Sequence, residues 1–121
     1  MKPVYDLADL RHWREATRDV DPPVRLGVFG EPVEHSLSPP MQNAALRHCG
    51  IAARYARFQI RRSELPEAVD RARELGFIGL NLTVPHKSAA LPLLDDAKDN
   101  ALIIGSVNTI SLKDARIVGY N

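Results

Sequence analysis

The stretch that decides the fold reads Gly-Leu-Asn-Leu-Thr-Val-Pro-His-Lys at residues 79–87. Successive side chains of a strand point to opposite faces, so the two leucines and the valine share one face, and Asn81 and Thr83 share the other. Pro85 has no N–H to donate and ends the strand. A helix pattern then starts at Lys87. The stretch predicts a strand that ends in polar side chains, a common place for polar ligands in α/β proteins; the alternative is an edge strand with a solvated face.

The segments on both sides of this stretch alternate between strand and helix patterns. Strands are expected at residues 24–30, 55–60, 77–84, 107–112 and 116–120, and the last two read as a hairpin around residues 113–115. Helices are expected at residues 38–49, 63–75, 87–94 and 95–104, with Pro92 making the third one short or kinked. This alternation predicts an α/β fold with three layers, α/β/α, around one mixed, mostly parallel sheet that ends in a C-terminal hairpin.

Capping residues and apolar stripes define the expected helices. Ser38 reads as an N-cap, with Pro39 at the first helical position. The stripe expected to face the core in this helix comprises Met41, Ala44, Ala45 and Cys49. In the helix that begins at Ser63, the stripe comprises Leu65, Ala68, Val69 and Ala72. The aspartates at positions 95 and 96 are expected to cap the last helix.

Residues 1–23 read as an extension that precedes the first predicted strand of the domain. Asp6 is placed to cap a helix that runs to about Arg18, with Leu7, Leu10 and Trp13 spaced along one side. This helix is either a linker or docks on the domain, and the pattern leaves both open. We therefore expect an N-terminal extension or linker helix at 1–23 and a binding domain at 24–121.

Length, charge and cysteine content exclude several classes of function. The chain has 121 residues and a formal net charge of +1, which predicts one core and gives no electrostatic sign of a nucleic-acid or acidic-membrane partner. Cys49 is the single cysteine, so no internal disulfide or cysteine–zinc cluster forms. No apolar run approaches the roughly 20 residues of a membrane span, and the first residues lack the apolar segment of a signal peptide. We expect a cytoplasmic protein with no membrane or nucleic-acid partner.

The sequence also lacks the usual marks of a metal or dinucleotide site. No group of His, Asp and Glu has metal-ligand spacing, and no G-x-G-x-x-G is present. We therefore expect neither a metal nor a nucleotide cofactor to bind this chain.

Two serines stand before the first turn of the helix predicted at 38–49. Free N–H groups and the partial positive charge of a helix start favour a carboxylate or a phosphate there. Pro39 and Pro40 remove two of those N–H donors, and the hydroxyls of Ser36 and Ser38 are present to compensate. The alternative is that Ser38 merely caps the helix and Ser36 is an ordinary loop serine.

A second group of polar candidates follows the predicted strands. Asn81 and Thr83 carry groups that hydrogen-bond the ring hydroxyls of a polyol, and Asn108 lies on a short strand after Gly105. Lys87, directly after the central strand, is able to act as an acid or base or to bind an oxyanion. The alternatives are a solvated strand face and a surface lysine.

Three segments carry a resemblance to a known family: residues 30–39 (Gly-Glu-Pro-Val-Glu-His-Ser-Leu-Ser-Pro), 81–87 and 105–110 (Gly-Ser-Val-Asn-Thr-Ile). Together they resemble the N-terminal, substrate-binding domain of shikimate dehydrogenase, over residues 24–121. The resemblance implies the reversible, NADP-dependent reduction of 3-dehydroshikimate to shikimate in aromatic amino-acid biosynthesis. It also implies a substrate carboxylate on Ser36 and Ser38, ring hydroxyls on Asn81, Thr83 and Asn108, and a catalytic role for Lys87.

The chain departs from the family pattern at its ends and in its hairpin. In the family, Gly-Tyr-Asn continues into Thr-Asp, whose aspartate pairs with the catalytic lysine, and then into an NADP-binding domain, whereas this chain stops at Asn121. Ala115 stands where the family often has glycine, and residues 4–23 resemble the connector of fused dehydroquinate dehydratase–shikimate dehydrogenase enzymes. We expect part of such an enzyme, with NADP held by the missing domain and no activity alone. The alternative is a non-catalytic module that binds a shikimate-like acid.

Overall fold

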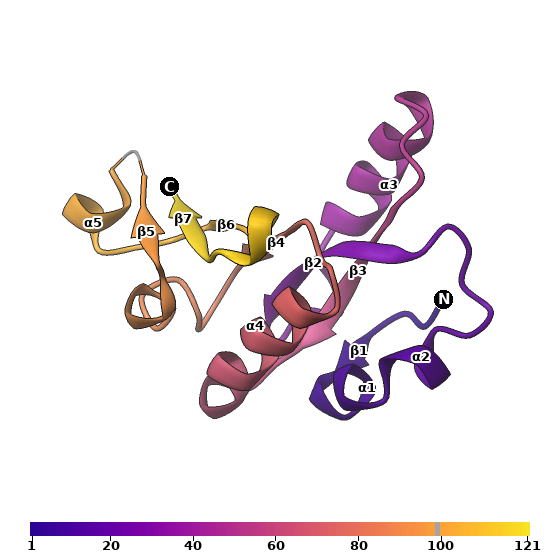
Figure 1. The fold of residues 1–121 in the computed structure, drawn as a ribbon, viewed down its shortest axis with the longest axis horizontal. Helices are drawn as coiled ribbons and strands as arrows, with labels where there is room; N and C mark the ends of the chain where they lie inside the picture. The colour runs from indigo at the N-terminus through magenta and orange to yellow at the C-terminus, as the bar shows by residue number, and fades with distance from the viewer. Residues whose placement is uncertain (99) are drawn as a thin grey trace.

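The computed structural model describes residues 1–98 and 100–121. These residues form one sheet of seven strands in the order β1-β3-β2-β4-β6-β7-β5 (Figure 1). The strands are β1 (Tyr5–Asp6), β2 (Val24–Gly30), β3 (Arg54–Gln59), β4 (Gly79–Leu82), β5 (Asp96–Ala97), β6 (Thr109–Ser111) and β7 (Val118–Tyr120). Neighbouring strands pair in parallel, except that β6 is antiparallel to both β4 and β7. The predicted mixed, mostly parallel sheet with a C-terminal hairpin is confirmed, and β1 and β5 are short strands beyond the five expected.

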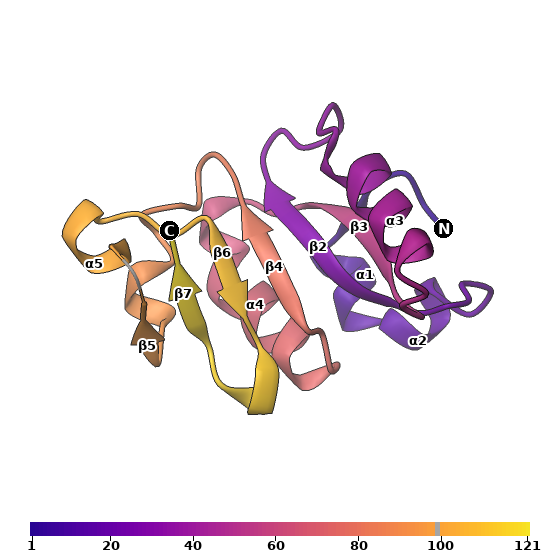
Figure 2. The same ribbon diagram turned by 90° about the horizontal axis from the view of Figure 1, so that it is seen from above.

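Helices cover both faces of this sheet. The α-helices are α1 (Leu7–Arg11), α2 (Trp13–Ala16), α3 (Ser38–His48), α4 (Leu65–Glu74) and α5 (Ala101–Ile104), and the 3-10 helices are η1 (Arg62–Glu64), η2 (Leu91–Leu93) and η3 (Lys113–Ala115). The apolar side of α4 packs in one cluster with Phe29 and Phe58, whereas Leu46 of α3 packs with Val28. Because residues 28 and 29 of one strand face opposite ways, α3 and α4 lie on opposite sides of the sheet (Figure 2). The three-layer prediction is confirmed.

Aromatic rings fill the core on the α4 side. The ring centroid of Phe58 lies 5.3 Å from that of Phe29 and 5.7 Å from that of Phe77. The ring centroids of Tyr5 and Trp13, both in the extension, lie 5.6 and 5.7 Å from that of Phe58. The residues expected on the inner side of α4 are all buried beside this cluster: Leu65, Ala68, Val69 and Ala72. Aromatic pairs of this geometry add about 0.5–1.5 kcal/mol each beyond the area they bury.

The extension is docked on the domain, and its helix is broken. Asp6 caps α1 as predicted, accepting a hydrogen bond from the Asp9 N–H at 2.9 Å while the Asp9 carboxylate accepts from the Asp6 N–H. The expected continuous helix to Arg18 is wrong, because the backbone of His12 leaves helical geometry and separates α1 from α2. The break accompanies the placement of both α1 and Trp13 against the aromatic core.

The helix expected at 87–94 does not form. Residues 87–90 make turns, and only the 3-10 helix η2 follows them. Pro92 has no N–H and clashes with a helical carbonyl four residues earlier, so an α-helical turn at this point cannot propagate. Lys87 therefore stands in a turn and not at the start of an α-helix.

The last predicted helix is also shorter than expected. Asp95 and Asp96 do not cap it: the Asp95 carboxylate accepts a hydrogen bond from the Ile117 N–H at 2.8 Å, and Asp96 lies in β5. Asp96 and Ala97 pair with β7 and do not form a helix, so α5 begins only at Ala101. Residue 99, within the predicted helix, lies outside the described residues.

The helix α3 differs from its prediction in its start and in its buried side. Leu37 is the N-cap and Ser38 is already the first helical residue, because the chain turns into helical geometry one residue early. The predicted stripe is largely exposed, with Met41 at 64% exposure. Asn43 faces the sheet instead, accepting from the Tyr55 N–H at 2.8 Å and donating to the Tyr55 carbonyl at 2.9 Å. The helix is thus held to β3 by a polar side chain, which an apolar-stripe pattern does not detect.

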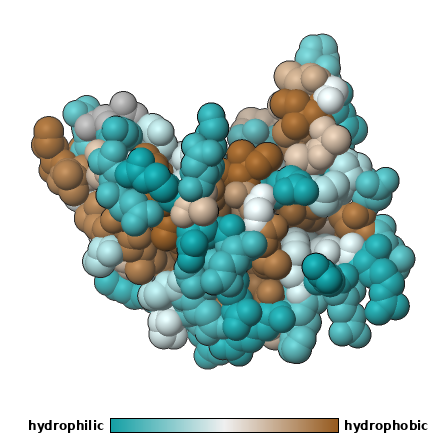
Figure 3. All heavy atoms as spheres, viewed as in Figure 1, coloured by the Kyte–Doolittle hydropathy of each residue, from teal (hydrophilic) through white to brown (hydrophobic). Residues whose placement is uncertain are grey.

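Hydrophobic side chains remain on the surface at two helices. Leu37 and Met41 are exposed at the start of α3, and Leu102, Ile103 and Ile104 are exposed on α5. Figure 3 shows the α5 group as a hydrophobic end of the molecule. Every helix among the described residues is too short or too polar to span a lipid bilayer.

Candidate functional site

The organising strand β4 is shorter than the strand expected at 77–84, and Val84, expected on the core face, lies after it and is 66% exposed. Within β4 the side chains divide between the two faces as predicted. Leu80 and Leu82 are 2% and 3% exposed and join the core, while Asn81 is half-buried on the opposite face. Register aligns Asn81 with Val28 of β2 on one side and with Thr109 of β6 on the other. The face that carries α3 over β3 is therefore polar over β4 and β6.

Three of the predicted site residues meet in one hollow. This serine hollow, of about 300 Å³, is lined by Val28, Pro32, Val33, His35, Ser36, Ser38, Leu82 and Thr83. Ser36 reaches it from the loop before α3, Ser38 from the first residue of α3, and Thr83 from the position directly after β4. The structure thus brings the two serines next to Thr83, which lies 45 or more residues away from them in the sequence. In the part of the chain that the structure describes, no cluster of three His, Cys, Asp or Glu side chains could hold a metal ion.

The serine loop is held in place by an arginine of β3. The Nε of Arg57 donates to the Ser36 carbonyl at 3.1 Å, and its Nη2 donates to the same oxygen. The Ser36 hydroxyl accepts from the Ser38 N–H at 3.3 Å. The half-buried Arg57 therefore fixes the loop that carries Ser36 and places a positive charge at its backbone, an arrangement that favours an anion nearby.

Asn81 and Asn108 form a second part of the site. The Asn81 Nδ2 donates to the Thr109 hydroxyl at 3.1 Å and to the Asn108 carbonyl at 3.4 Å. The Asn108 carbonyl also accepts from the Leu82 N–H at 2.9 Å, so the loop before β6 runs along the end of β4. These contacts hold the Asn81 side chain against the backbone that carries Asn108.

Lys87 lies beyond these residues on an anchored turn. Its side chain is exposed, and its carbonyl accepts from the Val107 N–H at 2.8 Å. The preceding His86 is fully buried, with its Nε2 2.7 Å from the Ile60 carbonyl oxygen. Burial lowers the pKa of His86, so its ring is neutral and donates from Nε2. The turn is therefore fixed on both sides, while the Lys87 ammonium makes no ion pair with any described residue.

The sequence analysis did not identify Tyr55, Arg57 and Thr109 as residues of this site. Tyr55 and Arg57 alternate along β3 with buried Ala56 and Phe58, so their spacing of two already placed them on the polar face. Which neighbouring strands these side chains contact depends on the order of the strands in the sheet, which the local sequence pattern does not predict.

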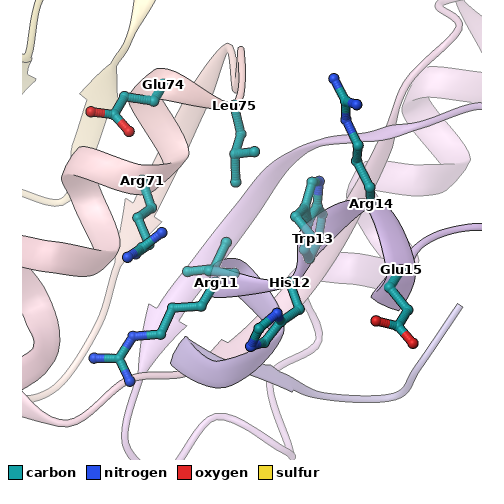
Figure 4. A pocket seen from close by; sticks show the side chains of 9 residues that line it. Arg11, His12, Trp13, Arg14, Glu15, Arg71, Glu74 and Leu75 are labelled. Atoms are coloured by element: carbon teal, nitrogen blue, oxygen red, sulfur yellow. The ribbon is translucent and has the colours of Figure 1, made fainter.

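A larger hollow, of about 390 Å³, lies between the extension and α4 (Figure 4). Leu10, Trp13 and Leu75 line it together with charged side chains. Two of the three arginines that line it, Arg11 and Arg71, both donate to Glu67, at 2.7 Å each from Nε. These cations are already paired, and none of the predicted site residues lines this hollow.

Comparison with known proteins identifies the family. The model of the shikimate dehydrogenase substrate-binding domain matches residues 28–110. The chain belongs to this family. The matched segment contains the serine loop, β4, Lys87 and Asn108, and it excludes the extension.

Individual members of the family share both sequence and fold with this chain. The NADP(+) shikimate dehydrogenase of Geobacillus kaustophilus is 48% identical over 95 residues, which cover 78% of this chain and 34% of that protein. The solved shikimate dehydrogenase of Thermus thermophilus in complex with shikimate superposes with a TM-score of 0.76 at 39% identity, covering 81% of this chain and 38% of the other. The 5-ketofructose reductase of a Gluconobacter strain superposes with a TM-score of 0.78 at 33% identity, covering 81% and 35%. The chain spans about a third of the length of the curated relatives it matches.

The loop and helix start that carry the two serines differ from the turn of a dinucleotide-binding motif. Dinucleotide pyrophosphates are held by a glycine-rich turn and by free N–H groups at a helix start. Here the loop between β2 and α3 contains no glycine, and prolines at positions 39 and 40 remove N–H groups from the first turn of α3.

Proposed function

We propose that this chain is the substrate-binding part of an NADP-dependent shikimate dehydrogenase and holds shikimate or 3-dehydroshikimate at the serine hollow and β4. The observation that carries the proposal is the meeting of Ser36, Ser38 and Thr83 in one hollow, beside the loop that Arg57 holds. The substrate carboxylate lies at the two serines in this proposal.

The energetics favour a carboxylate at the serines. A hydrogen bond to a charged group contributes about 1.5–3 kcal/mol, and the start of α3 adds roughly 0.3–1 kcal/mol for an anion. The Arg57 guanidinium strengthens this preference, because its charge lies next to Ser36. Loss of ligand freedom opposes binding, as does the lack of a second domain to exclude water, so we expect a dissociation constant of roughly millimolar to high-micromolar, about −4 to −6 kcal/mol.

The remaining predicted residues serve the ring in this proposal. Asn81, Thr83 and Asn108 hold ring hydroxyls, and Lys87 is the catalytic lysine that binds or protonates the reacting oxygen. NADP belongs to a part of the enzyme outside this chain, and the whole acts in the cytoplasm. The Thermus relative was solved with shikimate, which supports the choice of ligand.

The test is a titration of the ¹⁵N-labelled chain with shikimate, followed by NMR. Shifts are expected at residues 36–38, 81–87 and 108, and the affinity should fall at least tenfold in a Ser36→Ala, Ser38→Ala double variant, as the loss of one charged hydrogen bond requires. Shifts confined to the extension, or an unchanged affinity in the double variant, would contradict the carboxylate assignment.

Two controls make this test specific. Ser63→Ala removes an exposed hydroxyl from η1, away from the hollow, and should leave the affinity unchanged. 5-Ketofructose has no carboxylate, so it should bind the double variant and the unmodified chain equally. A preference for 5-ketofructose over shikimate would instead support a sugar ketone as the substrate, as the name of the Gluconobacter relative describes for that protein.

A further inference from the structure

We propose that Tyr55 is a positioning residue of this site: its hydroxyl fixes the amide of Asn81, and through Thr109 that of Asn108, in the orientation that receives the vicinal hydroxyls of the ligand. The inference rests on the proposed function for the identity of the ligand. It adds two residues, Tyr55 and Thr109, that act through others.

Tyr55 is placed to act as a donor. The Tyr55 side chain is 3% exposed and packs with Val28 and Val33, and its hydroxyl lies 2.7 Å from the Asn81 Oδ1. Burial raises the pKa of Tyr55 to about 12, with the facing Ser38 hydroxyl acting in the other direction, so the phenol keeps its proton at neutral pH. A carbonyl oxygen only accepts, so the phenol donates and the Asn81 oxygen must point toward β3.

The orientation of Asn81 then determines the next groups in turn. Its Nδ2 donates to the Thr109 hydroxyl at 3.1 Å, which leaves the Thr109 proton free to donate to the Asn108 Oδ1 at 3.0 Å. The Asn108 Nδ2 lies 3.5 Å from the Asn121 Oδ1, and Asn121 in turn donates to the Ser106 carbonyl at 2.9 Å. In this chain of hydrogen bonds, here called the amide chain, each group donates to the next in order, from Tyr55 of β3 to the Ser106 carbonyl in the loop before β6.

The amide chain prepares the site for a polyol. Each asparagine in it keeps acceptor capacity on its oxygen, in a direction fixed by its neighbours. A ring hydroxyl both donates and accepts, so it binds best where donor and acceptor positions are set before it arrives. Without the Tyr55 hydroxyl, no donor among the described residues holds the Asn81 oxygen toward β3, and only the contacts of its Nδ2 with Thr109 and Asn108 orient the amide.

The first test is made on the ligand-free chain. The Asn81 side-chain amide signals should move and broaden in Tyr55→Phe and in Thr109→Val, which break the amide chain from its two sides. Tyr5→Phe is the matched control, because it removes the hydroxyl of another buried tyrosine whose contact is with Lys2. Unchanged Asn81 amide signals in Tyr55→Phe, or in Thr109→Val if the first variant fails to fold, overturn the inference whatever the ligand proves to be.

The second test measures shikimate binding by titration. Tyr55→Phe and Asn81→Ala should each weaken binding about tenfold, and the double variant should be no weaker than Asn81→Ala within a factor of about two, because Tyr55 acts through Asn81. Losses that multiply in the double variant, or no loss in Tyr55→Phe, overturn the positioning role. If the unmodified chain does not bind shikimate, the proposed function fails, and the amide signals of the free chain still decide the inference.

Discussion

The buried ring of His86 links the turn that carries Lys87 to the end of β3. Its Nε2 contacts the Ile60 carbonyl, and its Nδ1 has no hydrogen-bond partner among the described residues. An imidazole so placed is neutral in the folded protein because burial lowers its pKa from the ordinary 6.5. Protonation therefore favours the unfolded chain, where the ring is free to charge.

We predict that the free energy of unfolding falls as the pH is lowered from 6.5 toward the folded-state pKa of His86, and that the contribution of this ring is fully present above 6.5. His86→Gln should flatten the profile in this window. His48→Gln, at an exposed position on α3, should leave the profile unchanged. Urea unfolding at pH values from 5 to 8 measures both, and a His86→Gln profile as steep as that of the unmodified chain would contradict the assignment.

Single residues were predictable where the local pattern contains the information. Period-two alternation was enough to put Asn81 and Thr83 on one face. The role of Tyr55 was not predictable, because its partner Asn81 lies on β4, and β2 stands between their two strands in the sheet.

Elements were predictable where side-chain periodicity and backbone chemistry agree. The four buried residues of α4 follow the helical repeat, and the structure confirms them. The helix predicted at 87–94 was wrong, since Pro92 leaves only a 3-10 turn there, and the helix predicted at 95–104 was too long, since Asp96 pairs with β7. In α3 the polar contact of Asn43 reverses the expected inner side.

The hairpin between β6 and β7 contains a backbone strain that a substitution can relieve. Ala115 has φ of 59°, in the left-handed region that disfavours a side chain by about 1–2 kcal/mol, and glycine adopts it freely. We predict that Ala115→Gly raises the free energy of unfolding by about 0.5–1 kcal/mol, since the extra freedom of unfolded glycine offsets part of the gain. Urea unfolding measures this change.

The control for this prediction has the opposite sign. Ala45→Gly, at an exposed site inside α3, should lower the free energy of unfolding by about 1 kcal/mol. Destabilisation in both variants would show that Ala115 does not carry the strain.

For the whole molecule, the extension and the family domain should behave as one cooperative unit. Trp13 is the single tryptophan of the chain and contacts Phe58 and Phe77, so its fluorescence reports the docking of the extension. We predict that urea unfolding followed by this fluorescence and by far-UV circular dichroism gives coincident transitions. Tyr5→Ala, which empties a fully buried position, should lower the free energy of unfolding by about 3–5 kcal/mol. Both transitions should then move together to lower urea concentration. A fluorescence transition at lower urea than the dichroism would mean an independent linker helix.

The strand order has a consequence for how the chain acquires its structure. The central strand β2 is synthesised before both of its partners, β3 on one side and β4 on the other. The strand β1 is likewise synthesised before its partner β3. Pairings so distant in sequence close slowly, on the order of milliseconds to seconds. During synthesis one edge of β2 remains unpaired until β3 has emerged, and the other edge remains unpaired until the chain has emerged past Leu82. Unpaired apolar edges associate with one another, so nascent chains shorter than this are the species of this domain most exposed to aggregation.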